Sequence, residues 1–225
     1  MDLVKSYDFF QPEKCHDRIH IIGCGAVGST VAELLSRFGL TKITLYDFDT
    51  VESHNIANQM FRATDIGKKK TEALGEYLLQ INPEMETDLK IEPEGYKGQR
   101  LSGYVFLCVD NIDLRREIAT ANKTNPYIKA MFDFRIRLED AQHYAADWKN
   151  PKMISSFLGT MNFTHEEAKK ETQVSACNIE LSVAPTVRQI CSSGVCNFIN
   201  FVKSGGKEIK KMILVDAFHY DIQAF

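Results

Sequence analysis

The chain has 225 residues, of which 44% are apolar and 25% charged, so its composition is that of a globular protein and excludes collagen-like, coiled-coil and disordered chains. Its 27 Lys and Arg residues against 30 Asp and Glu residues give a net charge of −3, which offers no electrostatic footprint for a polyanion, so nucleic acid is not an expected partner. The sequence shows no secretory signal and no uncharged apolar run near the roughly 18 residues of a membrane span, so we expect a cytoplasmic protein that does not bind membranes.

The first part of the chain predicts a βαβ unit. Residues 18–22 form an apolar, β-branched run that stops at Gly23, as a buried parallel strand does. Residues 26–38 carry apolar side chains at helical spacing and are followed by Gly39, a residue typical of helix ends. Residues 42–46 predict a second strand that closes at two aspartates, and the three elements together make one βαβ unit.

The middle of the chain continues this alternation. Residues 51–64 follow no clear period, which indicates a functional loop or a short broken helix. Apolar spacing predicts a helix that follows Gly67 and ends at Asn82-Pro83. Two apolar runs then predict a third strand over residues 89–91 and a fourth over residues 104–109. The next helix is expected over residues 114–122, with Asp113 as its candidate cap.

The last part of the chain is less regular. Residues 127–133 predict a fifth strand, and residues 135–145 an antiparallel or edge element. The sequence turns polar over residues 148–176, which we interpret as a mobile crossover loop or lid. Residues 181–202 predict a helical region and residues 212–215 a last strand.

Strands that alternate with helices predict an α/β fold. We expect a doubly wound, mostly parallel Rossmann-like sheet with an antiparallel C-terminal extension and a long crossover loop. One domain is expected over residues 1–225, with residues 1–17 as a lead. The six cysteines are expected to be reduced thiols, and the absence of a Cys-x-x-Cys pair argues against a structural zinc site.

A glycine motif joins the first predicted strand to the first predicted helix. Gly23, Gly25 and Gly28 form G-x-G-x-x-G, and because glycines let the backbone approach phosphate at a helix N-terminus, this context predicts a nucleotide site. Asp47 lies 19 residues after Gly28, where a carboxylate can accept hydrogen bonds from a ribose. ATP and NAD fit this pattern equally, and a glycine turn needed only for packing is the alternative.

Three further motifs distinguish between these nucleotides. They are Asp47-Phe48-Asp49-Thr50-Val51-Glu52-Ser53-His54-Asn55-Ile56-Ala57-Asn58-Gln59, then Gly67-Lys68-Lys69-Lys70, and Cys108-Val109-Asp110-Asn111 with Arg115. In order and spacing they resemble the motifs of the ThiF/MoeB/HesA family, the bacterial relatives of ubiquitin-activating enzymes. The pattern of that family is D-x-D-x-V-x-x-x-N-x-x-R-Q, then G-x-x-K and D-N-x-x-x-R. The resemblance extends more weakly to Ala184-Pro185 and residues 215–217.

The resemblance implies ATP-dependent adenylation of a C-terminal carboxylate, that of a ubiquitin-like or sulfur-carrier protein or peptide, with release of pyrophosphate. Lys70 matches the family's phosphate lysine and Asp110 the residue that holds Mg²⁺, so both are candidate catalytic residues. Asp47 would hold the ribose, and Asn55 and Gln59 would contact the triphosphate. The other predicted cofactor-binding residues are Asp49 and Asn111. The family also implies a homodimer, with a heterodimer as the alternative.

Cys177 is the third candidate catalytic residue. It matches, by its position before Ala184-Pro185, a cysteine that some family members use for acyl transfer or a persulfide-linked adduct. A small buried hydrophobe is its alternative interpretation. The other candidates also have simpler interpretations: a solvated charge run for Lys70, a helix cap for the residues after the fourth strand, and turn residues for Asp47 and Asp49.

Two departures from the family pattern favour other functions. Asn58 stands where the family has an arginine near the triphosphate, and the N-terminal segment lacks the arginine that the family donates to its partner subunit's site. Arg62, Lys68 or Lys69 are candidates to replace the lost cation. The main alternative is therefore a non-catalytic ATP-binding subunit or scaffold of a heteromeric activating complex. Activation of a small carboxylate, including one attached to tRNA, and an NAD-dependent oxidoreductase are further alternatives.

Overall fold

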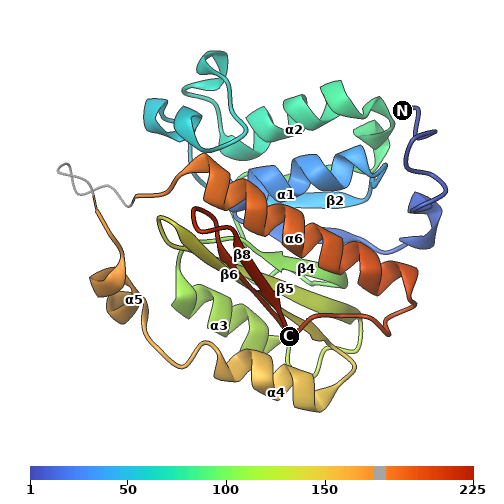
Figure 1. Cartoon of the computed structure of the whole chain (residues 1–225). Helices are drawn as coiled ribbons and strands as arrows, with labels where there is room; N and C mark the ends of the chain where they lie inside the picture. Colours follow the sequence, from blue (N-terminus) through green and yellow to red (C-terminus); the bar gives the residue numbers. More distant parts are fainter. Residues whose placement is uncertain (175–180) are drawn as a thin grey trace.

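The computed structural model describes residues 1–174 and 181–225, and an eight-stranded sheet forms the centre of this part of the chain (Figure 1). The strand order is β3-β2-β1-β4-β5-β6-β7-β8. Neighbours from β3 to β5 pair in parallel, and those from β5 to β8 pair antiparallel. The predicted fold class is confirmed. The strands are β1 (Ile19–Ile22), β2 (Ile43–Tyr46), β3 (Lys90–Glu92), β4 (Gly103–Leu107), β5 (Ile128–Ile136), β6 (Asp140–Asp147), β7 (Met212–Asp216) and β8 (Asp221–Ala224).

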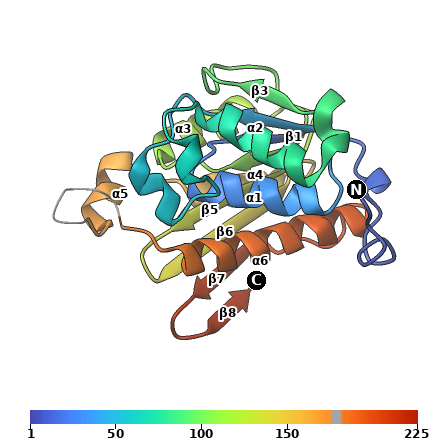
Figure 2. The same ribbon diagram turned by 90° about the horizontal axis from the view of Figure 1, so that it is seen from above.

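Helices cover both faces of the sheet (Figures 1 and 2). Val31 and Phe198 pack on one face, from α1 and α6, and Ile118 and Phe157 pack on the other, from α3 and α4. The α-helices are α1 (Ala26–Arg37), α2 (Lys70–Ile81), α3 (Ile112–Ala121), α4 (Pro151–Gly159), α5 (His165–Glu171) and α6 (Ala184–Lys203). Short 3₁₀ helices are η1 (Pro12–Lys14), η2 (Ser53–Ala57), η3 (Ala63–Asp65) and η4 (Pro83–Thr87).

The register of the three central strands positions the predicted site. β1, β2 and β4 are buried along their whole length, because helices cover both faces of the sheet. Ile22 pairs with Tyr46 on β2 and with Leu107 on β4. The three strands therefore end at one level, and the segments that follow them leave the same edge of the sheet. Open α/β sheets bind ligands at this edge.

The predicted elements from β1 to β4 are confirmed to within a few residues, and the stretch over 51–64 contains the short helical turns η2 and η3. One detail is wrong. α3 begins earlier than predicted because Asn111, not Asp113, is its cap. The Asn111 Oδ1 atom accepts hydrogen bonds from the backbone N of Asp113 at 2.9 Å and of Leu114 at 3.1 Å.

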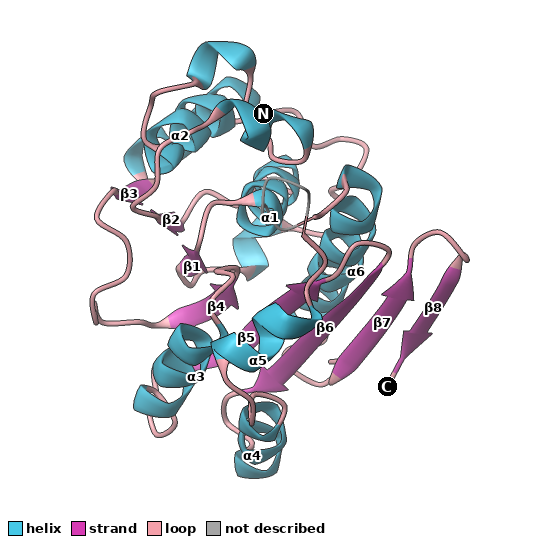
Figure 3. Ribbon diagram, turned by 90° about the vertical axis from the view of Figure 1, so that its left-hand side faces the viewer, coloured by secondary structure: helices cyan, strands magenta, loops and turns pink. Residues whose placement is uncertain are grey.

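The prediction of an antiparallel or edge element over residues 135–145 is confirmed in its antiparallel pairing and wrong in its bounds. β5 continues to Ile136, and the chain then turns before β6 begins, with the backbone N of Arg137 donating to the carbonyl O of Asp140 at 2.8 Å. β6 is antiparallel, as expected, but it is not an edge strand because β7 and β8 lie beyond it (Figure 3). β8 has no counterpart in the sequence prediction, since all four of its residues are exposed and show no buried face.

The prediction of a crossover loop or lid over residues 148–176 is wrong for residues 148–174, because α4 and α5 lie there, and its last two residues lie outside the described residues. α4 buries Phe157, whose ring packs edge-on against Trp148 with centroids 5.8 Å apart. α5 begins with a capping box between Thr164 and Glu167 and contains no buried residue. A helix without a buried face has no apolar period, so the sequence pattern did not reveal it.

α6 is the long helix that packs against β5, β6 and β7. Pro185 occupies its first turn, where the missing N–H costs no helical bond. Gly194 lies inside the helix, and a Cβ there would come within 2.3 Å of the Phe134 ring and 3.1 Å of the His143 Nδ1 atom. This glycine therefore lets α6 approach the sheet closely. Among the helices of residues 1–174 and 181–225, none is long and apolar enough to cross a membrane.

Gly194→Ala is expected to lower the free energy of unfolding by about 1–3 kcal/mol, because the new methyl group overlaps the buried ring of Phe134 even though alanine is the better helix former. Urea unfolding measures the change. Ser192→Ala is the matched control, since Ser192 is exposed on the same helix and should change stability by less than about 0.5 kcal/mol. Equal effects of the two substitutions would contradict the packing argument.

Candidate functional site

The glycine loop between β1 and α1 combines tight packing with open space. A Cβ on Gly23, whose φ is +98°, would lie 2.7 Å from the main chain of Cys108 and Val109, and one on Gly28 would lie 1.8 Å from the carbonyl O of Gly23. Packing alone explains these two glycines. A Cβ on Gly25, by contrast, meets no described atom within 4 Å apart from those of its two chain neighbours. Gly25 is the N-cap of α1, so the open space lies at a helix N-terminus, where an anion is favoured.

Asp47 connects this loop to the end of β2. Its Oδ2 atom accepts a hydrogen bond from the backbone N of Cys24 at 2.6 Å, and its Oδ1 atom from the backbone N of Asp49 at 2.8 Å. The carboxylate therefore fixes the turn after β2, in agreement with the turn-residue interpretation. Each oxygen has a second lone pair, so the predicted contact with a ribose hydroxyl is still available.

Of the three consecutive lysines Lys68, Lys69 and Lys70, Lys70 has the buried side chain. Its side chain is only 10% exposed, and its Nζ atom donates to the Oδ2 atom of Asp49 at 2.8 Å. Its backbone N also donates to the carbonyl O of Asp49 at 2.9 Å. Lys68 and Lys69 are more exposed and bind other groups. The solvated-run interpretation therefore holds for these two neighbours but not for Lys70, which lies beside the turn after β2.

Asn58, which replaces the family arginine, bonds through its Nδ2 atom to the Oγ atom of Ser182, just before α6. The three cations predicted as replacements already bind protein groups. These bonds join Arg62 to Asp65 and Gln80, Lys68 to Asp65 and Glu76, and Lys69 to the carbonyl O of Phe48. Their charges serve the local fold, so the structure gives no support for a replacement.

The two predicted polar contacts of the triphosphate differ in their surroundings. Asn55 is buried, and its Oδ1 atom accepts from the backbone N of Glu52 at 2.9 Å, which caps η2. Gln59 has a buried Oε1 atom that finds no hydrogen-bond partner within the residues that the structure describes. This oxygen is an acceptor, so a donor from water or a ligand can pair with it. The next residue, Met60, bonds through its backbone N to Ser29 of α1.

Asp110 and Asn111 follow β4 and have different roles. The Asn111 side chain caps α3, in agreement with the helix-cap interpretation. Asp110 is exposed, and in the described part of the chain its carboxylate forms no hydrogen bond or ion pair. Because Gly23 contacts the main chain of Cys108 and Val109, Asp110 lies close to the glycine loop in the fold.

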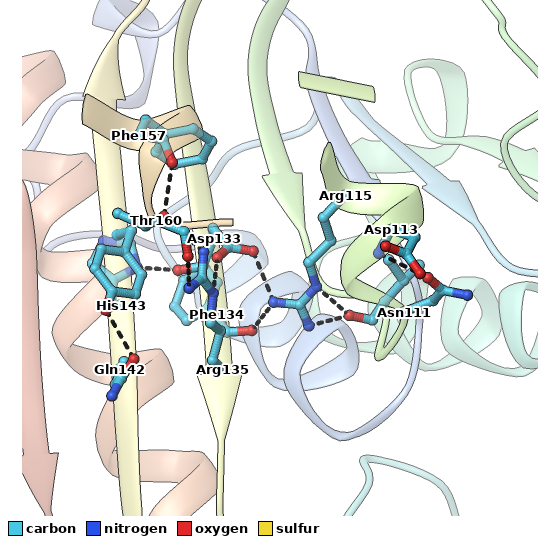
Figure 4. Close-up of polar contacts among 12 residues, drawn as sticks. Asn111, Asp113, Arg115, Asp133, Phe134, Arg135, Gln142, His143, Phe157 and Thr160 are labelled. Carbon is cyan, nitrogen blue, oxygen red and sulfur yellow. Dashed lines mark hydrogen bonds and ion pairs between the residues drawn. The ribbon is translucent and has the colours of Figure 1, made fainter. Parts of the chain in front are cut away.

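A buried ion cluster joins α3 to β5 (Figure 4). Asp133 of β5 is fully buried, and its carboxylate pairs with Arg115 at 2.7 Å and with Arg135 at 2.7 Å. Arg115 belongs to the family motif, but the sequence prediction missed Asp133 and Arg135. The sequence did contain a signal for this pairing, since Asp133 lies between two phenylalanines in a predicted buried strand. A carboxylate buried there needs a cationic partner.

His143 adjoins this cluster from β6. Its Nδ1 atom lies 3.1 Å from the carbonyl O of Asp133, and its Nε2 atom lies 3.1 Å from the Nδ2 atom of Asn197 on α6. Burial lowers the pKa of His143 to about 4. The imidazole is therefore neutral at pH 7 and bridges the sheet and α6 rather than transferring protons.

The cysteines and the acidic groups limit the chemistry of this edge. Burial raises the pKa of the Cys24 and Cys108 thiols, so both remain protonated and unreactive. Cys177, the predicted catalytic cysteine, lies outside the described residues.

Over residues 1–174 and 181–225, no group of three or more His, Cys, Asp or Glu is placed to hold a metal ion. An ion here would depend on Asp110 and on oxygens of a bound phosphate, a donor set that suits Mg²⁺.

Comparison of the sequence with known proteins gives a family match and a set of curated relatives. A family model described as "ThiF family" matches residues 13–225. The chain is 36% identical over 121 residues to ubiquitin-like modifier-activating enzyme 5 from Dictyostelium discoideum, covering 45% of this chain and 31% of that protein. It is 32% identical over 143 residues to the enzyme of the same name from Drosophila erecta, covering 56% and 34%. The chain thus spans about a third of the length of these curated relatives.

Solved structures share the fold. The crystal structure of E. coli MccB with ATP matches with a TM-score of 0.69 at 16% identity, covering 95% of this chain and 65% of that one. MccB with AMPCPP and MccA gives a TM-score of 0.69 at 17% identity, with the same coverage. PaaA gives a TM-score of 0.69 at 15% identity, covering 100% of this chain and 68% of its own. At these identities the likeness shows the fold alone.

The glycine loop supplies a matched pair of substitutions. Gly28→Ala is expected to destabilise the protein by about 1–3 kcal/mol or more, because its Cβ overlaps the carbonyl O of Gly23. Gly25→Ala should leave the melting temperature unchanged and weaken ATP binding, because its methyl group enters open space where a phosphate is predicted. Thermal unfolding and calorimetry separate the two effects. Unchanged ATP affinity in Gly25→Ala would show that this space does not receive phosphate.

Proposed function

Because this chain belongs to the ThiF family, we propose that it uses ATP to adenylate a C-terminal carboxylate, that of a ubiquitin-like or sulfur-carrier protein or of a peptide, and releases pyrophosphate. The observation that carries this proposal is the convergence of three groups at one edge of the sheet: the open glycine loop, the buried Lys70 and the exposed Asp110. Adenylation requires a phosphate cradle, a cation and an oxygen donor for a metal ion.

The glycine loop and β2 would bind the nucleotide. Backbone N–H groups at the start of α1 favour phosphate, and the space beside Gly25 lets a phosphate approach them. Asp47 would accept from the ribose with the lone pairs that Cys24 and Asp49 leave free. ATP as the nucleotide is supported by membership of the family and by the shared fold of MccB, which has been solved with ATP.

Lys70 would stabilise the charge that moves during the reaction. A carboxylate oxygen of the acceptor forms a bond to the α-phosphorus, and the bond from that phosphorus to the bridging oxygen breaks, its electron pair leaving with pyrophosphate. Both reactants are anions, so a cation must offset their repulsion. The ammonium group of Lys70 has three N–H donors, and Asp49 accepts from one. Lys70 can therefore bind a phosphate without breaking its ion pair.

Asp110 would hold Mg²⁺, which when bound neutralises phosphate charge and orients the leaving pyrophosphate. The residues present fit this ion, because Asp110 is exposed at the end of β4 and forms no bond to another described residue. Gln59 and Asn55 would each offer the amide nitrogen to a phosphate oxygen, and the unpaired Oε1 atom of Gln59, an acceptor, would need a donor such as water.

The proposed acceptor is a protein or peptide C-terminus. Two lines support it: the relatives carry the name ubiquitin-like modifier-activating enzyme 5, and the MccB structures that share the fold contain MccA. A homodimer and a catalytic role of Cys177 are further predictions of the family resemblance. Sedimentation and mass spectrometry of the reacted protein are the measurements that address them.

A second candidate function is a non-catalytic ATP-binding subunit of a heteromeric complex. The identity of residue 58 favours it, because a neutral amide bonded to Ser182 stands in place of the family's arginine. Nucleotide binding without turnover would distinguish this function from adenylation.

Lys70→Ala is expected to weaken the binding of ATP with Mg²⁺ by roughly 10-fold to 100-fold, the range for loss of a charge-assisted hydrogen bond. Isothermal calorimetry measures the affinity, with NAD⁺ titrated in parallel. Lys69→Ala is the control, because Lys69 belongs to the same charge run but donates to a backbone carbonyl; its affinity should stay within about 2-fold of the wild type. Binding of NAD⁺ alone would overturn the assignment of the nucleotide.

ATP–pyrophosphate exchange tests turnover. With a genuine carboxylate partner, the wild type is expected to exchange label and Asp110→Asn to lose at least about 10² in rate, because its amide cannot supply the charge of a metal ligand. Asn58→Arg restores the cation that the family carries. ATP binding without exchange in the wild type, together with exchange in Asn58→Arg, would favour the non-catalytic subunit over adenylation.

A further inference from the structure

Arg115 holds the main chain immediately before Asp110. Its Nε atom donates to the carbonyl O of Val109 at 2.6 Å, and its Nη2 atom donates to the same oxygen. The opposite side of the guanidinium, Nη1, bonds to the Asp133 carboxylate at 2.7 Å and to the carbonyl O of Phe134. Figure 4 shows this side chain between the start of α3 and β5. It therefore ties the segment after β4 to the next strand of the sheet.

The shape of the guanidinium matters for this arrangement. A planar fork with several N–H donors can engage a carbonyl on one side and a carboxylate on the other, whereas a lysine ammonium acts as a single point charge. Arg115 is 5% exposed and Asp133 is fully buried, so neither bond is weakened by water. The carbonyl O of Val109 is thus held in one position.

We propose that Arg115, oriented by Asp133, is a positioning residue that fixes the Val109–Asp110 backbone so that the Asp110 carboxylate can receive the metal ion of a metal–nucleotide complex. This inference rests on the proposed function, which places Mg²⁺ on Asp110. It adds that the metal response of the site depends on a buried cluster that touches neither the ion nor the nucleotide. The segment before Asp110 is thus held twice, by the hydrogen bonds from Arg115 to Val109 and by the packing of its main chain against Gly23.

The structure provides a matched control on the same carboxylate. Arg135 pairs with the other oxygen of Asp133, also at 2.7 Å, but its remaining donors reach the carbonyl O and the Oγ1 atom of Thr160 after α4. Arg115→Lys and Arg135→Lys therefore disturb one buried aspartate in the same chemical way. Only Arg115→Lys also removes the two N–H donors that bind the carbonyl O of Val109.

The experiment is calorimetric binding of ATP to the full chain, with Mg²⁺ and with EDTA, in the wild type, Arg115→Lys, Arg135→Lys and Asp110→Asn. Arg115→Lys is expected to lose at least about 10-fold of the Mg²⁺-dependent gain in affinity, as does Asp110→Asn, while its affinity in EDTA stays within about 2-fold of the wild type. Arg135→Lys is expected to retain the Mg²⁺-dependent gain even where its melting temperature falls as far as that of Arg115→Lys.

Other outcomes separate failure of this inference from failure of the proposed function. Absence of any Mg²⁺-dependent binding in the wild type, or an unchanged Mg²⁺ response in Asp110→Asn, overturns the proposed function. A response lost in Asp110→Asn but retained in Arg115→Lys, or lost equally in both lysine variants, overturns the positioning role alone.

A measurement on the wild type covers the case in which Arg115→Lys does not fold. The buried guanidinium N–H groups can be followed by ¹⁵N NMR, with the Arg135 signal assigned from Arg135→Lys. Addition of Mg²⁺ to the ATP-bound protein is expected to shift the Nε–H signal of Arg115, because its acceptor carbonyl adjoins Asp110, and to leave that of Arg135 in place. An unmoved Arg115 signal would overturn the positioning role.

Discussion

The parallel register of β1, β2 and β4 is the constraint on which the site depends. Because Ile22, Tyr46 and Leu107 lie side by side, the three following segments leave the sheet at one level, and groups distant in sequence meet without long loops. Gly23 sets how closely they meet, since its backbone approaches that of Cys108 to a distance that admits no side chain. Main-chain contacts therefore set the spacing at this edge, and the Asp47 and Arg115 side chains hold the segments that follow β2 and β4.

Burial explains which elements the sequence pattern could predict. β1, β2 and β4 are buried throughout and are visible as continuous apolar runs, and α1 has a buried stripe. α5 contains no buried residue and β8 is exposed along its length. Neither element therefore has the regular spacing of apolar residues that distinguishes a helix or strand from a loop. The turn between β5 and β6 was missed for a related reason. It is set by pairing between the two strands, which a local pattern does not contain.

Sequence motifs selected the candidate residues, but not the hydrogen bonds that each one forms. The parallel register explains why Asp47 and Asp110 follow strands that end at the same edge, and the ion pair with Asp49 brings Lys70 to it. Spacing did not separate Asp110 from Asn111, whose side chain is taken up by the cap of α3. The pairing of Asp133 with Arg115 was equally hidden, because it forms across the sheet between a helix and a strand that are separate in sequence. Such assignments depend on hydrogen bonds that exist only after the elements have packed.

Cys24 stands between the first two glycines of the loop that joins β1 to α1, and its thiol lies against the end of β2. It is fully buried, its Sγ atom donates to the carbonyl O of Tyr46 at 3.8 Å, and burial raises its pKa. A thiolate at this position would cancel the partial positive charge that the N–H groups at the start of α1 present. By keeping this sulfur protonated, the fold adds no second negative charge beside the Asp47 carboxylate, and it protects the sulfur from alkylation and oxidation, which require the thiolate. The fold thus places an uncharged thiol, rather than a thiolate, beside the start of α1.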